Sequence, residues 1–341
     1  MGLDTVLDLF AAYQRTAAVK TAVELDLFSA IAEGADTAAR LAVRCHAAER
    51  GLRILCDYLT VIGLLVKQDD RYALGRDAAM FLDRHSPGYV GSVVTSVAGD
   101  TNLRAFAALT TAVRRGGTAL PSEGTLARDH PAWVEFARAM VPGGAFMGPL
   151  LASLLGVQAG GRMRVLDIAA GHGLYGIAVA RRNPAAQIVA LDWPNVLEVA
   201  REHAEAAGVA DRYHELAGSA LTVDFGEDYD LVLLVHFLQD LDAEACRRLL
   251  VKVRTALVSE GRAVVLGFVP DDGRVSPPAH AAFGLAMLAT TPGGDAYTVS
   301  ELDRMFRDAG FARTELHELA PTTERVVIAY RSDDSRGSDH R

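Results

Sequence analysis

A run of small residues near the middle of the chain has the composition of a nucleotide-binding turn. Residues 165–176 read VLDIAAGHGLYG, in which an apolar predicted strand passes through glycines into a predicted helix. Glycines let the backbone approach a ligand closely, and a helix N-terminus offers unpaired N–H groups. Asp192 follows the next apolar run, where a carboxylate can accept hydrogen bonds from the two hydroxyls of a ribose. Together these residues predict a nucleoside-containing cofactor.

Two cofactors fit this turn. The run GHGLYG satisfies the GxGxxG pattern of NAD-dependent oxidoreductases, although that pattern alone is weak evidence. Asp167, Ala169, Gly171 and Gly173 also fit the acid–glycine motif of S-adenosylmethionine (SAM) methyltransferases, with one glycine replaced by alanine. The Asp167 carboxylate would attract the ammonium group at the methionine end of SAM and would repel a pyrophosphate. A cap on the local turn is the structural alternative for Asp167.

The residues after 161 form the elements that must position this turn. Between 161 and 331, apolar predicted strands alternate with amphipathic helices, and a hairpin over 312–319 and 325–330 closes the series. This alternation predicts an α/β domain with a Rossmann-like, mostly parallel seven-stranded sheet covered by helices on both faces. Residues 332–341 are polar and are predicted to be a disordered tail.

Residues 1–105 have a different, mostly helical pattern. Helices predicted over 13–32, 38–43 and 48–62 precede two short apolar runs about a polar turn, which is a winged-helix pattern. The helix that would recognise DNA, 48–58, holds two arginines, two acids and a glycine, which make a poor phosphate-binding face. A dimerisation domain is therefore favoured, and a winged-helix transcription regulator is the non-enzymatic alternative.

Residues 106–160 predict a helical connector whose large side chains could line an acceptor pocket. Pro142, Gly143 and Gly144 are expected to open a turn before a helix that reaches Leu155. An aromatic or polyketide-like small molecule would suit a pocket built from the large apolar side chains of this connector and of a later helix, namely Phe136, Met140, Phe146, Phe283 and Met287. Core packing would explain the same residues.

Composition narrows the class of protein. The chain has 341 residues, a net charge of −9, 50% apolar and 23% charged residues, which excludes a wholly disordered chain. The acidic balance disfavours binding to nucleic acid or to an anionic membrane, and no apolar run approaches the roughly 20 residues of a membrane span. The three cysteines form no close metal-binding pair, and the N-terminus lacks a secretory signal. We therefore expect a cytoplasmic protein without a metal.

The order of these motifs resembles a known family. The runs VLDIAAGHG, ALDWP, LAGSAL, DLVLLVHFLQDLDAE and GRAVVLGFVPDDGR follow the winged-helix region, and the likeness covers roughly residues 5–331. This chain is similar to the small-molecule O-methyltransferases that include caffeate-type plant enzymes and bacterial secondary-metabolite enzymes. The resemblance implies SAM as cofactor, a small-molecule acceptor and a homodimer formed through the N-terminal domain.

The resemblance also implies roles for the cofactor-binding residues. The methionine end of SAM would lie against the acid–glycine turn described above. Asp192 would bind the ribose hydroxyls, with Trp193 close to the adenosine, and Gly218 and Ser219 would lie beside the adenine. Relatives usually have an aspartate where this chain has Ser219, so a negative charge is missing there.

The catalytic residues of the family are replaced in this chain. In the relatives, a histidine after the fourth strand removes the proton of the acceptor hydroxyl, and two glutamates orient that histidine. The matching positions hold Gln239, Gly267 and Val299. A glutamine side chain does not titrate near neutral pH and cannot act as a general base.

Three explanations of this replacement are open. The acceptor atom could need no base, as with a carbon, a nitrogen or an already acidic phenol. Another residue could serve as base, and His236 is the closest candidate because it ends the same predicted strand. The chain could also bind SAM without transferring a methyl group. His236 and Gln239 are therefore the catalytic candidates, and we expect Gln239 to line the acceptor pocket.

Overall fold

The computed structural model describes residues 2–121 and 131–332, and the chain forms two compact units, residues 1–103 and 104–341. The predicted connector, 106–160, belongs to the second unit. The predicted tail lies outside the described residues from 333 onward, so its disorder stays a prediction. Within the described ranges, no helix is long and apolar enough to cross a membrane.

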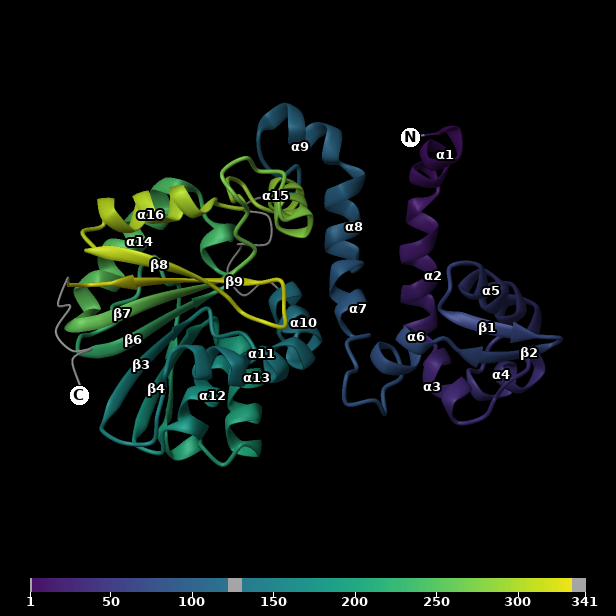
Figure 1. Ribbon diagram of the computed structural model, residues 1–341, viewed down its shortest axis with the longest axis horizontal. Coiled ribbons are helices and arrows are strands. Elements are labelled where there is room, and N and C mark those ends of the chain that lie inside the picture. The colour runs from purple at the N-terminus through teal and green to yellow at the C-terminus, as the bar shows by residue number, and fades with distance from the viewer. Residues whose placement is uncertain (1, 122–130, 333–341) are drawn as a thin grey trace, which may run out of the picture. The chain divides into compact units, whose positions relative to one another are not determined.

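The first unit consists of short helices and a two-stranded hairpin (Figure 1). Its elements are α1 (Leu3–Phe10), α2 (Ala12–Glu24), α3 (Leu27–Ala32), α4 (Ala38–Arg44), α5 (Glu49–Val61), β1 (Leu65–Gln68), β2 (Arg71–Leu74), α6 (Arg76–Phe81) and α7 (Val93–Val97), and α8 (Asp100–Ala107) spans the boundary between the units. The predicted pattern of helices followed by an antiparallel hairpin is confirmed.

One predicted helix of this unit is wrong. Residues 13–32 do not form a single helix, because Asp26 between α2 and α3 has a φ of 54°, a left-handed conformation that a right-handed helix cannot continue. By contrast, α4 begins at its predicted cap, where the Thr37 hydroxyl accepts a hydrogen bond from the Arg40 N–H at 3.3 Å.

The second unit is a sheet with helices on both faces. Its elements are α9 (Leu109–Arg115), α10 (Pro131–Ala139), α11 (Val141–Leu154), β3 (Met163–Ile168), α12 (Leu174–Arg182), β4 (Ala186–Asp192), α13 (Pro194–Ala206), η2 (Ala210–Arg212), β5 (Tyr213–Ala217), β6 (Tyr229–Val235), η3 (Leu238–Asp240), α14 (Ala243–Ala256), β7 (Leu257–Gly267), α15 (Pro278–Thr290), α16 (Val299–Asp308), β8 (Arg313–Glu318) and β9 (Arg325–Tyr330).

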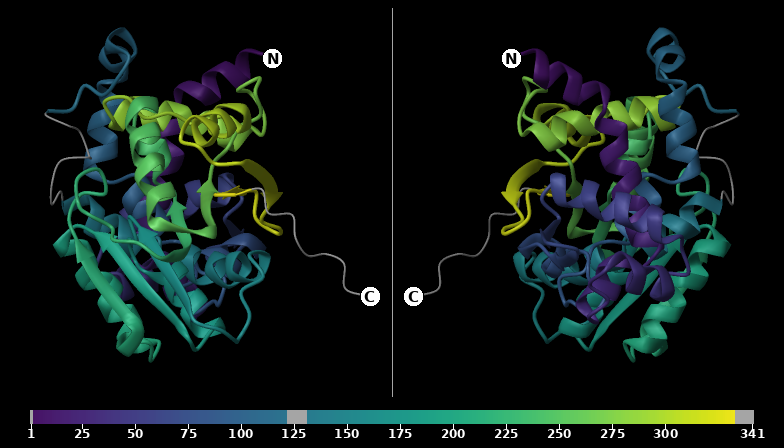
Figure 2. Two further views of the ribbon diagram at one scale, coloured as in Figure 1. Left: turned by 90° about the vertical axis from the view of Figure 1, so that its left-hand side faces the viewer. Right: turned by 90° about the vertical axis from the view of Figure 1, so that its right-hand side faces the viewer.

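The sheet has the order β5-β4-β3-β6-β7-β9-β8. Strands β3 to β7 pair in parallel, and β9 is antiparallel to both β7 and β8. The β8–β9 hairpin closes one edge of the sheet and is yellow in Figure 2. This is the predicted Rossmann-like, mostly parallel seven-stranded sheet.

Two apolar cores lie on opposite faces of this sheet. Side chains of α14 and α16 pack against one face, and side chains of α11, α12 and α13 pack against the other (Figure 1). The inner strands are almost wholly buried, as in β6, because helices cover both of their faces. With both faces covered, the open side left for a ligand is the edge where the parallel strands end.

The turn predicted at Pro142, Gly143 and Gly144 is wrong, because these residues form the first turn of α11. Proline is tolerated in a first helical turn, where its missing N–H would have no partner within the helix. Gly144 and Gly148 let α11 lie close to the glycine turn after β3 and to α12. A Cβ atom added to Gly144 would lie 2.3 Å from the His172 ring, and one added to Gly148 would lie 3.0 Å from the Leu174 carbonyl oxygen.

Candidate active site

A pocket of about 440 Å³ opens where the parallel strands end. The turn after β3, the end of β4, the turn after β5 and the end of β6 form its floor, and α10, α14 and the loop after α15 form its walls. Its volume is in the range of small-molecule sites. Eight of the residues predicted for the site line it: Phe136, Ala169, Gly171, Asp192, Trp193, Gly218, Ser219 and His236.

The glycine turn is held in place by the neighbouring strand. The Ala170 N–H donates to the Leu191 carbonyl oxygen at 3.1 Å, and the Gly171 N–H donates to Asp192 Oδ2 at 2.9 Å. Gly173, which caps α12, has a φ of 75°, and a Cβ atom there would lie 2.5 Å from the Tyr213 hydroxyl. Gly173 is therefore required by the fold of the turn, although it does not line the pocket itself.

Asp192 is the charged group at the centre of the pocket floor. Its Oδ2 accepts from Gly171 N–H, and its Oδ1 accepts from Trp193 N–H at 2.7 Å. Burial raises the pKa of Asp192 to about 6, although these two hydrogen bonds lower it in part. Each carboxylate oxygen keeps a further lone pair, so the group can still accept the two hydroxyls of a ribose.

The remaining predicted residues of the adenosine end lie around Asp192. Trp193 caps α13 and, like Trp133 and Val134 of α10, packs against a small buried cluster of Ala137, Val196 and Val199. Gly218 N–H donates to the Asp192 carbonyl oxygen at 2.9 Å, which brings Ser219 to the same wall. The Ser219 hydroxyl accepts from Leu221 N–H at 3.3 Å and therefore keeps its own proton to donate. These donors, the acid and the aromatic ring fit the adenosine half of SAM.

Asp167 lies outside this pocket. Its side chain is buried below the turn, and its Oδ2 accepts a hydrogen bond from Gly176 N–H of α12 at 3.1 Å. Burial raises its pKa to about 8, with Gly176 lowering it in part, so the carboxyl group is largely uncharged at neutral pH. This geometry corresponds to the turn cap, and a contact with the methionine ammonium of SAM stays a prediction.

His236 stands at the end of β6 and lines the same pocket as Asp192. Its backbone has a φ of 51°, which is uncommon for a residue other than glycine, and its N–H donates to the Leu266 carbonyl oxygen at 2.8 Å. Its Nε2 lies 3.0 Å from Glu324 Oε2, a carboxylate at the start of β9. Burial lowers the pKa of His236, but the neighbouring carboxylates, Glu324 before Asp240, more than offset this, so the pKa is raised.

Gln239 lies in η3 and lines a second, small cavity of about 20 Å³, which His236 and the end of β7 also line. A Cβ atom added to Gly267 would lie 3.2 Å from Gln239 Oε1 and 3.6 Å from His236 Nδ1. Positions 239 and 267, which the resemblance matches to the family's histidine and one of its glutamates, are therefore adjacent here. Gln239 does not line the larger pocket, contrary to expectation.

The predicted acceptor-binding residues divide into two groups. Phe136 lines the pocket together with its neighbour Trp133, whose ring meets it edge to face at 5.8 Å. Phe283 does not line the pocket, and its ring centroid lies 4.7 Å from that of Phe268. The other three do not line the pocket, and they are Met140, Phe146, which is 56% exposed, and Met287, which is buried in α15.

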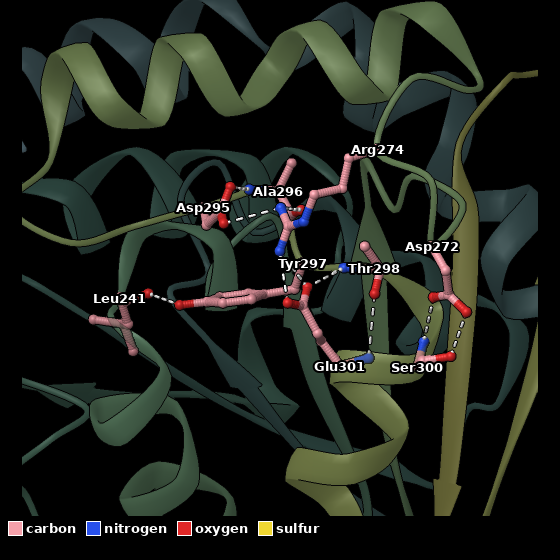
Figure 3. Close-up of polar contacts among 9 residues, drawn as sticks. All are labelled: Leu241, Asp272, Arg274, Asp295, Ala296, Tyr297, Thr298, Ser300 and Glu301. Carbon is pink, nitrogen blue, oxygen red and sulfur yellow. Dashed lines mark hydrogen bonds and ion pairs between the residues drawn. The ribbon is translucent and has the colours of Figure 1, made fainter. Parts of the chain in front are cut away.

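A polar network fixes the loop that forms one wall of the pocket (Figure 3). Arg274 donates to both carboxylate oxygens of Glu301 at 2.6 Å and to Asp295 Oδ2 at 3.0 Å. The Tyr297 hydroxyl donates to the Leu241 carbonyl oxygen at 2.6 Å. Since Leu241 lines the pocket, this network connects the segment before α16 to the site.

Several pocket residues were not predicted from the sequence. Trp133 carries a usable signal, because it stands three positions before Phe136 on the same helix. Asp240, whose pKa burial raises to about 7 and His236 lowers in part, directly follows Gln239 in the motif. Arg248, which lines the pocket, and Glu324, which contacts His236, carry no such signal, because only the fold brings α14 and the β8–β9 hairpin to the site.

Sequence comparisons identify both parts of the chain. Residues 152–312 match the model of the O-methyltransferase domain, and residues 7–84 match that of the O-methyltransferase dimerisation domain. A 3-hydroxy-5-methyl-1-naphthoate 3-O-methyltransferase from Streptomyces sahachiroi is 30% identical over 332 residues, which are 94% of this chain and 93% of that protein. The N,N-dimethyltransferase OxyT from Streptomyces rimosus is 28% identical and covers 78% of each chain.

A solved structure agrees with these matches. A candidate O-methyltransferase from Nostoc punctiforme is 49% identical, covers 97% of this chain and 99% of its own, and superimposes with a TM-score of 0.93. These likenesses decide between the two cofactors that the glycine turn allowed, in favour of SAM and against NAD. The chain therefore belongs to the family of SAM-dependent O-methyltransferases that carry an N-terminal dimerisation domain.

Proposed function

We propose that this enzyme methylates a small aromatic, polyketide-like acceptor that binds at the His236 side of the pocket. The observation that carries the proposal is the shared pocket, which is lined by Asp192 and Gly171, by His236 and by the aromatic side chains of Trp133 and Phe136. SAM supplies the methyl group as an electrophile. The chain's own residues hold the two reactants side by side, which is worth roughly 7–11 kcal/mol when they are well aligned.

The residue at position 239 limits which acceptor atoms the enzyme could methylate. Gln239 does not titrate, so that position supports a carbon, a nitrogen or an acidic phenol oxygen as acceptor. Loss of a general base slows transfer by about 10²–10⁴-fold. This loss applies to acceptors that must be deprotonated, so it limits the range of acceptors and does not abolish methyl transfer. The relatives include both an O-methyltransferase of a hydroxynaphthoate and an N,N-dimethyltransferase, which supports an aromatic acceptor of either type.

Radiolabelled SAM tests the proposal. The purified protein is incubated with methyl-labelled SAM and three naphthalene probes that carry a hydroxyl, an amine or neither group. We expect the label to appear in the product of the hydroxyl probe, of the amine probe or of both. Asp192→Asn should strongly reduce the amount of labelled product. Binding of S-adenosylhomocysteine without label in any product would instead support the alternative, a SAM-binding member of the family without methyl transfer.

We also propose that the enzyme is a homodimer formed through its first unit. Residues 7–84 match the dimerisation domain, and α1 exposes large apolar side chains that a monomer would leave in water. Small aromatic acceptors and this second copy of the chain are the partners that we propose.

A further inference from the structure

We propose that His236, positioned by Glu324, is the general base of this enzyme and that its acceptor is therefore a phenolic hydroxyl. The inference rests on the proposed methyl transfer and extends its acceptors to a phenolic hydroxyl that keeps its proton, which position 239 alone would not support. The position that the resemblance matches to the family's base holds Gln239, which does not titrate and does not line the larger pocket. The base has instead moved from η3 to the end of β6.

The first observation is the position of His236. It lines the pocket that Asp192 and the glycine turn also line, so its ring borders the space where an acceptor would meet the cofactor. The His236 side chain is 21% exposed, which leaves the ring accessible from the pocket. Its φ of 51° is held by the hydrogen bond to Leu266, and such uncommon backbone conformations concentrate at functional sites.

The second observation is the partner of His236. Glu324 is 8% exposed, and among the described residues His236 is its only ion-pair partner. The backbone of Glu324 is fixed by the β8–β9 turn, where its carbonyl oxygen accepts from Leu319 N–H at 3.0 Å. A buried carboxylate is costly unless it is paired, so this arrangement keeps Glu324 directed at the imidazole.

The pairing determines which nitrogen can act as the base. His236 Nε2 lies 3.0 Å from Glu324 Oε2, so a proton held on Nε2 by this carboxylate would leave the lone pair on Nδ1. Within the described residues, no group donates a hydrogen bond to Nδ1, and Gly267 beside it carries no side chain. A carboxylate beside an imidazole that lines the pocket, with one ring nitrogen left without a donor, is the arrangement of an oriented general base.

The step balances without any further reactant. As the acceptor oxygen forms its bond to the methyl carbon, the sulfur–methyl bond of SAM breaks and its electron pair stays on sulfur. The hydroxyl proton passes to Nδ1 of His236, and Glu324 stabilises the imidazolium that results. The proton then leaves to solvent, and the products are the methyl ether and S-adenosylhomocysteine.

Other ionisable groups around His236 must be separated from it in any pH experiment. Asp240 of η3 lines the pocket, with a pKa raised by burial to about 7. His172 of the cofactor turn is buried, which lowers its pKa to about 3 and removes it from the neutral range. The buried Tyr175 of α12 has a raised pKa, so its phenol does not ionise near neutral pH.

The first test measures the pairing without turnover. Nuclear magnetic resonance of the ring-labelled histidines, assigned with His236→Asn, gives the pKa of His236 in the whole protein. Asparagine is chosen because it tolerates the left-handed backbone better than alanine does. We expect Glu324→Gln to lower this pKa by about one unit or more, because it removes the neighbouring negative charge. An unchanged pKa would overturn the pairing.

The second test measures catalysis with two probes of similar shape. 1-Naphthol keeps its proton at neutral pH, whereas a nitro-substituted naphthol is already ionised. We expect His236→Asn to slow methylation of 1-naphthol about 10²–10⁴-fold and that of the ionised probe less than about tenfold. An equal loss of methylation rate with both probes would show that His236 has a structural role and is not the base.

The pH profile then assigns the titrating group. With 1-naphthol, the rate should rise with pH as His236 loses its proton, and Glu324→Gln should shift this rise to lower pH. Asp240→Asn should keep the rise and move it only in the same direction, to lower pH, because the charge of Asp240 also raises the pKa of His236. A profile that loses its rise only in Asp240→Asn would make Asp240 the base. Glu318→Gln is the matched control, since this carboxylate of the same hairpin pairs with Arg325 at the surface.

These experiments distinguish failure of the base assignment from failure of the proposed methyl transfer. Transfer to the amine probe but to neither naphthol would overturn the hydroxyl acceptor and leave the methyl transfer intact. Binding of S-adenosylhomocysteine without transfer to any probe would contradict the methyl transfer, while the histidine titration would still decide the pairing.

Discussion

At the scale of single residues, the charge of Asp192 links cofactor binding to pH. Burial raises the pKa of this acid to about 6, while the hydrogen bonds from Gly171 and Trp193 favour its charged form. Ribose hydroxyls would add two further donors, so the cofactor binds the ionised carboxylate more tightly than the protonated one. Affinity should therefore be full above pH 6 and should fall as the pH drops through that value.

Calorimetric titration with S-adenosylhomocysteine between pH 5 and 8 checks this. We expect the loss below pH 6 to approach tenfold per pH unit. Asp192→Asn should weaken binding at pH 7.5 by about 1.5–3 kcal/mol and flatten the pH dependence. Asp240→Asn is the control and should keep the dependence near pH 6. Equal affinity at pH 5 and pH 7.5 would show that the charge of Asp192 is not used.

Local motifs explain which site residues could be predicted from the sequence. The glycine turn and Asp192 each end a strand, so the chain itself carries both their type and their position. Asp167 shows what the motif alone cannot predict. The motif gives the residue type correctly, but the Asp167 carboxylate accepts a hydrogen bond from Gly176 N–H of α12 and does not line the pocket. Glu324 could not be predicted, since its partner His236 is distant in the chain and only the sheet order brings the two together.

At the scale of elements, the loop between α15 and α16 depends on Arg274. This side chain joins Asp295 to Glu301, and the same segment reaches the pocket through Tyr297 and Leu241 (Figure 3). Pro292 and Gly293 of this loop line the pocket directly. Loss of Arg274 should therefore loosen the acceptor wall more than the cofactor floor.

Steady-state kinetics of Arg274→Ala checks this. We expect the KM for the acceptor to rise several-fold, with a smaller change in kcat and no change in the affinity for S-adenosylhomocysteine. A double-mutant cycle with Glu301→Ala should give a coupling of about 0.5–1 kcal/mol in unfolding free energy, because the pair is partly exposed. Arg247→Ala, which removes a surface pair within α14, is the control. A kcat loss at unchanged KM would place Arg274 in another role.

Element boundaries show where pattern reasoning fails at this scale. The parallel strands were predictable because their burial on both faces leaves continuous apolar runs in the sequence. The first turn of α11 was predicted as a loop, because proline and two glycines disfavour a helix in isolation. Tertiary packing reverses that preference, since the absence of a side chain at Gly144 is what lets α11 approach His172.

At the scale of the whole molecule, the exposed apolar face of α1 requires a partner. Five large side chains of α1 and the start of α2 are more than half exposed, namely Leu3, Leu7, Leu9, Phe10 and Tyr13. Contiguous apolar surface of this kind marks an interface in a protein that stays in solution. Together with the match to the dimerisation domain, it predicts a stable homodimer.

Sedimentation velocity at micromolar concentration checks the dimer. We expect a single species of twice the chain mass, and Phe10→Asp should shift it towards monomer, because a buried unpaired charge is costly. Asp4→Asn, on the same helix, should leave the dimer unchanged. A wild-type protein that sediments as a monomer would refute the assembly and leave the site in the second unit unaffected.

The most direct test of the account is a crystal structure of the protein with S-adenosylhomocysteine and 1-naphthol. We expect both ribose hydroxyls on the Asp192 carboxylate, the adenine beside Gly218 and Ser219, and the naphthol hydroxyl within hydrogen-bond distance of His236 Nδ1. An adenosine bound away from Asp192 would contradict the cofactor site. A naphthol hydroxyl that contacts Gln239 and lies out of hydrogen-bond reach of the His236 ring would contradict the proposal that His236 is the base.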